Sequence, residues 1–205
     1  MIRYMFLGLV QGFTEFIPVS SSGHLVVFQH LLGIHEEVVF LDIVLHMGTL
    51  CSLFVFFRTD LFILFSNFVS AVIDIIFRRR VAYVWRYNDK FRLCIYLLIT
   101  TMVTGAIGLM GKRFFESSFE KIPVVMVGFV ITGIVLLSIR HCYFGQRYLQ
   151  HILTRDAFFI GIVQSFAIVP GISRSGTTLA ALFFRNVEKE SAFKQAIGDA
   201  HITHL

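Results

Sequence analysis

Long apolar runs separated by short polar segments dominate the sequence. The runs Leu93–Gly111 and Ile122–Ile139 contain no charged residue, and each is long enough to cross about 30 Å of hydrocarbon as a helix. A third run, Val38–Phe57, is apolar except for Asp42 and His46, which share one helical face. This pattern predicts an all-α, polytopic membrane protein.

A fourth apolar run, Leu61–Phe77, is ambiguous. It contains Asn67 and Asp74 and is followed by three arginines at positions 78–80. Such a segment either spans the bilayer or lies along its surface as an amphipathic helix. The sequence leaves both arrangements open.

Two further apolar segments are interrupted by residues that a lipid-facing helix would not carry. Tyr4–Gly33 contains a glutamate, a proline, three consecutive serines and a histidine, and Ala157–Phe184 contains a Pro-Gly pair followed by Ser-Arg-Ser-Gly. Broken backbone at membrane depth is tolerated where it is buried in protein or lines a wet cavity. Both segments are therefore predicted to be re-entrant helix–loop–helix hairpins.

The two broken segments resemble each other. The sequence GLVQ at residues 8–11 matches GIVQ at 161–164, and SSSG at 20–23 matches SRSG at 173–176. The offset from Gln11 to Gly23 equals the offset from Gln164 to Gly176. Glycine, glutamine and serine at the same offsets indicate an internal duplication.

Lysine and arginine set the expected orientation, because they collect in cytoplasmic loops. The strongly basic stretch 58–92 should be cytoplasmic. If Leu61–Phe77 lies at that surface, an odd number of spans separates the two hairpins, and the second is inverted relative to the first. If Leu61–Phe77 spans the bilayer instead, the two hairpins are parallel. We favour the inverted arrangement. Inverted hairpins can build a site near the bilayer midplane. We expect a single membrane-embedded domain at 1–185, with repeats at about 4–34 and about 157–185.

The composition supports a membrane protein and excludes other classes. Hydrophobic residues make up 56% of the chain and charged residues 15%, whereas a soluble domain carries about 25% charge. So much apolar side chain must face lipid, which excludes a soluble enzyme, a nucleic-acid-binding protein and a secreted disulfide scaffold. The net charge is +5. In a membrane protein the excess of basic residues is expected to lie in cytoplasmic loops, so we do not expect a nucleic acid as partner.

The polar residues of the hairpins form a candidate site for a multiply charged anion. Both serine-rich loops precede a helix, whose N-terminal backbone N–H groups bind anions. Arg174 adds a guanidinium suited to a bidentate grip on phosphate oxygens. Glu15 and Gln11 share a helical face and could hold a divalent cation, and His24 could transfer protons or activate a serine.

Each of these residues also has an ordinary structural interpretation. Serines and prolines in membrane helices serve packing and kinks, Arg174 and Glu15 could form a structural ion pair, and His24 could be a buried structural residue. Asp42 and His46 are interpreted mainly as structural. The combination, duplicated and set in broken helices, favours phosphoryl transfer, which requires charge neutralisation, in-line attack and a proton acceptor.

At these residues the sequence resembles the undecaprenyl-pyrophosphate phosphatase family, also known as bacitracin-resistance proteins. The matching motifs are QGFTEFIPVSSSGHL at 11–25 and VPGISRSGTT at 169–178, and the similarity extends to about Glu188. The resemblance implies hydrolysis of undecaprenyl diphosphate to undecaprenyl phosphate and inorganic phosphate, which recycles the cell-wall lipid carrier and confers bacitracin resistance. It also implies a multi-pass protein of the bacterial plasma (inner) membrane whose site opens to the periplasmic or outer side, and it leaves a homodimer open.

The resemblance further implies a role for each motif residue. Glu15, Ser21, His24 and Arg174 would be catalytic, with Ser21 and His24 sharing nucleophilic attack and proton transfer in a way that the sequence does not fix. Glu15, together with Gln11, would bind Mg²⁺ or Ca²⁺. The remaining motif residues would bind the substrate, and they are Ser20, Ser22, Ser173, Ser175 and Thr178.

Two features depart from the family pattern. Gln11 stands where many members have glutamate, so metal binding is expected to rest more on Glu15. Members continue after the second motif with further apolar spans, whereas residues 186–205 are too polar to cross a bilayer. The sequence therefore predicts a C-terminally truncated chain with an aberrant tail. Two alternatives stay open: an inactive fragment, and a polyprenyl-lipid transporter or flippase built on inverted hairpins.

Overall fold

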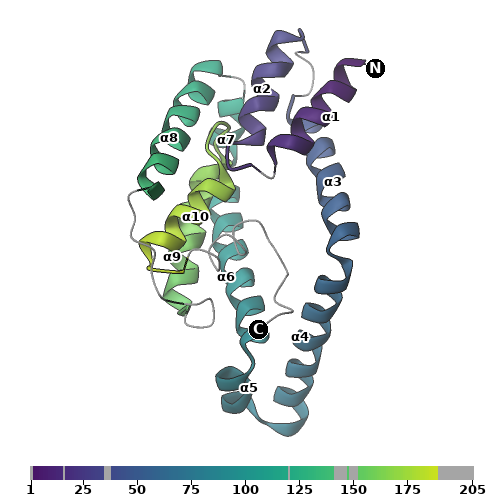
Figure 1. Cartoon of the computed structure of the whole chain (residues 1–205), viewed down its shortest axis with the longest axis vertical. Helices are drawn as coiled ribbons and strands as arrows, with labels where there is room; N and C mark the ends of the chain where they lie inside the picture. The colour runs from purple at the N-terminus through teal and green to yellow at the C-terminus, as the bar shows by residue number, and fades with distance from the viewer. Residues whose placement is uncertain are drawn as a thin grey trace.

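The computed structural model describes residues 2–15, 17–34, 38–119, 121–140, 147 and 152–188. Within these ranges the elements are helices, with no named β-strand, so the all-α prediction is confirmed (Figure 1). The helices are α1 (Ile2–Thr14), α2 (Ser21–Leu31), α3 (Val38–Phe56), α4 (Arg58–Arg78), α5 (Val81–Tyr87), α6 (Asp89–Met110), α7 (Lys112–Phe119), α8 (Ile122–Arg140), α9 (Thr154–Ser165) and α10 (Arg174–Phe184), with a 3₁₀ turn at Phe166–Ile168.

Three helices of the described part are long and apolar enough to cross a membrane, namely α4, α6 and α8. Two of them contain the uncharged runs that the sequence predicted as spans. Helix α6 begins earlier than that run, because Asn88 caps it by accepting a hydrogen bond from Phe91 N at 2.9 Å. Large apolar side chains on these helices point outward, as Met102 and Val130 do, which fits helices that face lipid.

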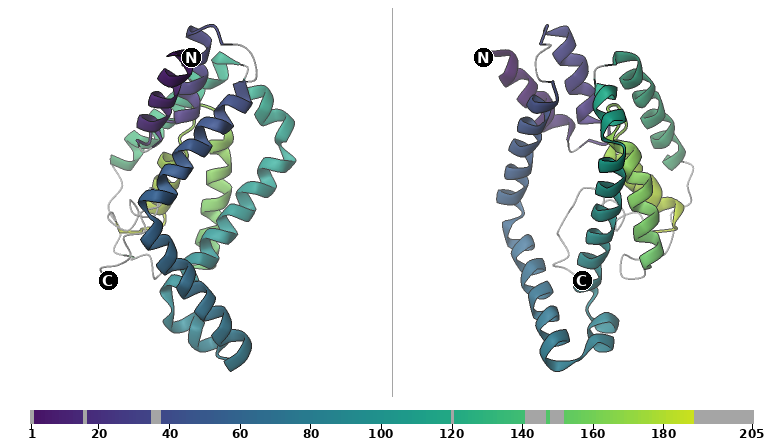
Figure 2. Two further views of the ribbon diagram at one scale, coloured as in Figure 1. Left: turned by 90° about the vertical axis from the view of Figure 1, so that its right-hand side faces the viewer. Right: turned by 180° about the vertical axis from the view of Figure 1, so that it is seen from behind.

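The ambiguous run forms α4, which continues α3 in the same direction. Figures 1 and 2 show the two helices as one long, bent rod, and Phe57 is the single residue between them. Helix α5 connects α4 to α6. A small hydrophobic cluster holds the three helices together, with Ala71 from α4, Val84 from α5 and Phe91 from α6. Because α3 and α4 share one direction, α4 adds no reversal of the chain between the two broken segments, whether or not it spans.

The two broken segments form helical hairpins whose loops face each other. Helices α1 and α2 make the first hairpin and α9 and α10 the second, and both Figure 1 and Figure 2 show the two loops meeting. This opposed arrangement is what inverted hairpins would have, and their re-entrance into a bilayer stays a prediction. Of the predicted tail 186–205, residues 189–205 lie outside the described part.

Helix α10 is the buried centre of the second hairpin. All of its residues from Gly176 to Phe183 are buried. Leu182 and Phe183 belong to a cluster with Tyr96 of α6 and Ile160 of α9. This packing fixes the helix whose first residue is Arg174.

A buried cluster of charges ties the open end of the second hairpin together. The carboxylate of Asp156 accepts hydrogen bonds from Arg147 at 3.0 Å, from the backbone N–H of Leu153 at 2.9 Å and from Arg185 Nε at 2.6 Å. Burial alone would raise the pKa of Asp156, but these donors together hold it below its ordinary value. The cluster links the start of α9 to the end of α10.

Replacing Asp156 with asparagine is expected to destabilise the protein by about 3 kcal/mol, because two guanidinium groups lose their buried counter-charge. The measurement is thermal unfolding in detergent at neutral pH. Asp89→Asn is the matched control, since Asp89 also pairs with an arginine, Arg92, but is half exposed, and such surface pairs contribute little. Equal midpoints for the two variants would contradict a stabilising role for the buried cluster.

Candidate active site

A cavity of about 550 Å³ lies where the two hairpins meet α3. The first hairpin contributes Glu15 and the serines 20–22, and the second contributes Arg174 between Ser173 and Ser175, with Thr178 one turn further on. The structure thus brings together most of the residues that the two motifs singled out. Apolar side chains of α3 and α6 complete the wall: Ile43, Met47, Leu50, Leu53 and Leu97.

The two loops end with the same capping hydrogen bonds, although the backbone of Ser20 has a φ of +67° and that of Ser173 is extended. Ser20 caps α2 and Ser173 caps α10, and each hydroxyl accepts a hydrogen bond from a glycine N–H, at 3.4 Å from Gly23 and 3.1 Å from Gly176. In both loops the capping hydroxyl also lies 3.3–3.4 Å from the hydroxyl two residues later. The matching offsets in the sequence therefore correspond to matching caps, and two positive helix ends reach the cavity.

The two hairpins are in direct contact at Gly171, which bonds the Ser20 side chain and lies against the backbone of Gly23. Ser20 Oγ accepts a hydrogen bond from Gly171 N at 3.1 Å. A Cβ atom added to Gly23 would lie 2.7 Å from Gly171 Cα, and Gly171 itself has a φ of +93°. Only glycine allows this approach and this conformation.

Helix α8 is hydrogen-bonded to the backbone of the second loop. Thr132 Oγ1 donates a hydrogen bond to Gly171 O at 2.7 Å and accepts one from Ser173 N at 3.0 Å. Thr132 is buried, so both backbone groups are satisfied away from water. The loop that carries Arg174 is thereby held by α2 on one side and α8 on the other.

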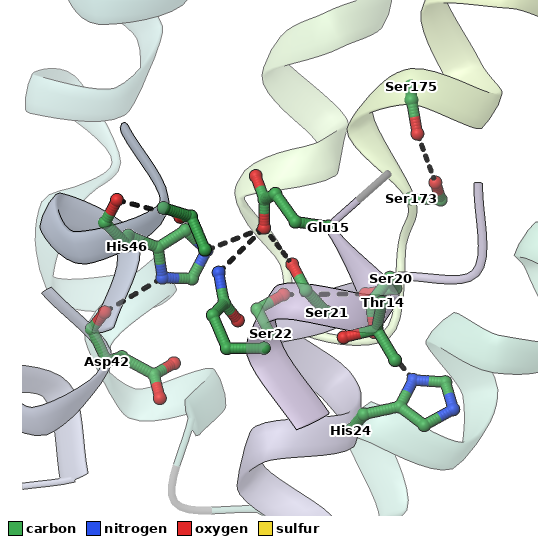
Figure 3. Close-up of polar contacts among 12 residues, drawn as sticks. Thr14, Glu15, Ser20, Ser21, Ser22, His24, Asp42, His46, Ser173 and Ser175 are labelled. Carbon is green, nitrogen blue, oxygen red and sulfur yellow. Dashed lines mark hydrogen bonds and ion pairs between the residues drawn. The ribbon is translucent and has the colours of Figure 1, made fainter. Parts of the chain in front are cut away.

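Glu15 is the centre of a hydrogen-bonded cluster on the other side of the cavity. Its Oε2 accepts hydrogen bonds from Ser21 Oγ at 2.6 Å and from Gln11 Nε2 at 2.7 Å, and His46 Nε2 lies 3.5 Å from the same oxygen (Figure 3). A serine hydroxyl directed at a carboxylate has a proton acceptor in place, which is how hydroxyl nucleophiles are activated.

His24 lies outside this cluster. Its Nδ1 is 2.8 Å from the carbonyl oxygen of Ser20, and its ring packs edge-to-face on Phe129 with centroids 4.9 Å apart. His24 is not among the residues that line the cavity, and Figure 3 shows its ring well apart from Glu15. The imidazole beside Glu15 belongs to His46, a residue that the sequence offered mainly as structural.

Arg174 lines the cavity with an exposed side chain. Within the described ranges, neither Glu15 nor another carboxylate lies within ion-pair distance of its guanidinium. Arg174 and Glu15 therefore do not form the structural ion pair that the sequence left open. Its charge faces the cavity, where it can meet an anionic ligand.

The described residues contain no group of three His, Cys, Asp or Glu side chains that could hold a metal ion, so a divalent cation beside Glu15 would take only a few of its ligands from the protein. Gln11 is fully buried, and its Oε1 has no hydrogen-bond partner in the described part. The carboxylate of Glu15 is the second oxygen donor. Few protein oxygens, completed by phosphate oxygens and water, are typical of Mg²⁺ sites.

Comparison with known proteins decides the family. The model of the family described as bacitracin resistance protein BacA matches residues 4–197. The chain belongs to the BacA family. Its curated relatives include an undecaprenyl-diphosphatase of Alkaliphilus metalliredigens, 39% identical over 194 residues that cover 94% of this chain and 69% of the relative.

Other relatives of this BacA chain carry the same name. The undecaprenyl-diphosphatase of Syntrophotalea carbinolica is 39% identical over 93% of this chain and 68% of its own length. That of Methanobrevibacter smithii is 36% identical over 94% of this chain and 69% of its own length. The BacA chain thus spans about two thirds of the length of the relatives it matches, with both motifs inside the matched region.

Proposed function

We propose that this chain hydrolyses undecaprenyl diphosphate to undecaprenyl phosphate and inorganic phosphate. The observation that carries the proposal is that Glu15, Ser21 and Arg174 line one cavity. A proton acceptor, a hydroxyl and a guanidinium are the groups that cleavage of a phosphoanhydride needs. The printed names of the curated relatives support the same reaction.

Two properties of the cavity suit a lipid diphosphate. The N-termini of α2 and α10 and the guanidinium of Arg174 favour a multiply charged anion, with Ser20, Ser22, Ser173, Ser175 and Thr178 as further hydrogen-bond donors. The apolar wall from α3 and α6, which includes Leu50 and Leu97, suits the first isoprene units of the lipid.

In this proposal Ser21 is the nucleophile and Glu15 is its base. The 2.6 Å hydrogen bond from Ser21 Oγ to Glu15 Oε2 lets the carboxylate take the proton as Oγ bonds to the terminal phosphorus. The bond from that phosphorus to the bridging oxygen breaks, and its electron pair leaves with undecaprenyl phosphate. Water then attacks the phosphoserine, Glu15 returns the proton to Ser21, and inorganic phosphate departs.

The other motif residues position these groups. Arg174 binds oxygens of the terminal phosphate and stabilises the charge that develops there. His24 donates its Nδ1 proton to Ser20 O and so holds the loop that carries Ser21. Glu15 and Gln11 would hold a divalent cation such as Mg²⁺ or Ca²⁺, which would neutralise diphosphate charge.

The proposal extends to the cellular setting. The helices that are long enough to span a membrane fit a protein of the plasma membrane, and we place the site on its outer side. There the reaction would return the lipid carrier to cell-wall synthesis, and removing the diphosphate would confer resistance to bacitracin.

The test is phosphate release from undecaprenyl diphosphate by the purified chain in detergent. Ser21→Ala is expected to lower the rate roughly 10³-fold or more, because the nucleophile is removed. Ser117→Ala is the matched control, since Ser117 is a partly exposed serine of α7 that donates a hydrogen bond to Phe114 O of its own helix and does not line the cavity. Full turnover by Ser21→Ala would exclude Ser21 as nucleophile. Absence of phosphate release by the unmodified chain would contradict the hydrolase proposal and favour a transporter or an inactive fragment.

A further inference from the structure

The chain between α4 and α6 collects basic and aromatic side chains at the end of the α3–α4 rod opposite the first hairpin (Figures 1 and 2). We infer that this basic turn, residues 78–87, binds the headgroups of anionic phospholipids at the membrane surface. None of its residues lines the cavity, so the inference does not rest on the proposed function.

Three guanidinium groups of the basic turn have no carboxylate to neutralise them. Arg79, Arg80 and Arg86 are exposed, and none of them forms an ion pair within the described ranges. Arg78, by contrast, lies 3.1 Å from Asp74 of the same helix. Guanidinium groups bind phosphate oxygens bidentately. Their concentration in one short segment therefore suits a surface that is dense in phosphate groups.

Two tyrosines of α5 hold two of these guanidinium groups in a row. Arg80 Cζ lies 5.9 Å from the ring centroid of Tyr83, and Arg86 Cζ lies 5.8 Å from that of Tyr87. The two rings are neighbours, with centroids 5.0 Å apart. A cation over a ring is attracted to the face of that ring, and the N–H groups of the guanidinium stay available as donors. The row is thus arranged before a phosphate arrives, which reduces the entropy lost on binding.

Exposed apolar side chains flank the same arginines. Ile76 and Phe77 lie in the last turn of α4 and Val81 begins α5, with exposed fractions of 63%, 78% and 57%. A nucleic acid offers phosphates without an apolar layer beneath them, whereas a bilayer offers both. Basic and aromatic side chains beside apolar ones are typical of segments that lie in the membrane interface. The side chains therefore favour a phospholipid surface over a nucleic acid.

Packing holds α5 in place and supplies a reporter. Val84 is buried in the cluster with Ala71 and Phe91, and the ring of Trp85 packs edge-to-face on Tyr96 of α6 with centroids 6.2 Å apart. Trp85 is also 41% exposed. It is the single tryptophan of the chain, so tryptophan fluorescence reports on the basic turn alone.

The experiment places the full chain in nanodiscs that contain phosphatidylcholine and phosphatidylglycerol in equal amounts, with bromine on the acyl chains of one lipid or of the other. Bromine quenches tryptophan on contact, so the ratio of the two quenching efficiencies measures which lipid surrounds Trp85. Each basic side chain near an anionic surface contributes roughly fivefold in affinity. We expect phosphatidylglycerol to be preferred roughly 10-fold or more, and the preference to disappear in about 1 M salt, which screens exposed charges.

The double variant Arg80→Gln/Arg86→Gln should lower this preference at least about fivefold. Arg113→Gln/Arg155→Gln is the matched control, because both arginines are exposed, lie outside the basic turn and do not line the cavity. The control removes the same amount of charge and should keep the preference. Equal quenching by the two lipids in the unmodified chain, a preference that survives high salt, or an equal loss in the control variant would overturn the inference. Loss of the preference on addition of a single-stranded oligonucleotide would also overturn it and assign the surface to nucleic acid.

Discussion

Replacing Arg174 with alanine will lower the rate of phosphate release from undecaprenyl diphosphate by roughly 10²- to 10³-fold, the loss typical of removing one preorganised group that stabilises transition-state charge. Arg174 is the first residue of α10 and lines the cavity. The buried packing of α10 holds its Cα in place, so the guanidinium meets the substrate with little rearrangement. The measurement is kcat/KM for the purified chain in detergent.

Two further variants sharpen this result. Arg174→Lys keeps the charge but loses the planar fork, so it should recover only part of the rate. Arg155→Ala removes an exposed arginine of α9 that does not line the cavity, and it should retain full activity. Equal rates for Arg174→Ala and Arg155→Ala would show that the diphosphate is bound elsewhere.

Replacing Gly171 with alanine will destabilise the protein by roughly 2–5 kcal/mol, as overpacking and a left-handed conformation combine. The added Cβ would lie 2.3 Å from the carbonyl oxygen of Val125 and 3.0 Å from Gly128 Cα. These are backbone atoms, which cannot move without shifting α8 or the loop. The loop would also lose its hydrogen bond to Ser20, so phosphate release should fall with stability.

Gly133→Ala on α8 is the matched control. An added Cβ at Gly133 meets no atom within 4 Å, and alanine is favoured over glycine inside a helix by up to about 1 kcal/mol. Its thermal midpoint in detergent should therefore equal or exceed that of the unmodified chain. A Gly171→Ala protein with an unchanged midpoint would contradict the close contact between the two loops.

The sequence predicts the elements that depend on local pattern. Uncharged apolar runs predicted the helices α6 and α8, because a span is determined by composition alone. The duplicated serines and glycines indicated two equivalent loops, and Ser20 and Ser173 do cap their helices in the same way. Capping depends on neighbours within one turn, so it can be predicted from a short segment.

The features that the sequence did not predict depend on packing between distant segments. Which imidazole faces Glu15 depends on how α3 packs against α1, and nothing in the motif around His24 specifies it. The partners of Asp156 come from Arg147 and Arg185, which lie in different segments. The direction of α4 follows from its alignment with α3, whereas hydropathy reports only length and polarity.

The hydrogen bond between Ser20 and Gly171 joins residues 151 positions apart, and that separation has a consequence for biosynthesis. The first hairpin leaves the ribosome long before the second hairpin has been synthesised. Until then the loop between Glu15 and Ser21 lacks its contact with Gly171. Contacts between remote segments form late and slowly. The nascent chain should therefore stay inactive until the segment around Gly171 has been inserted, and the unpaired first loop is exposed to cellular quality control until then.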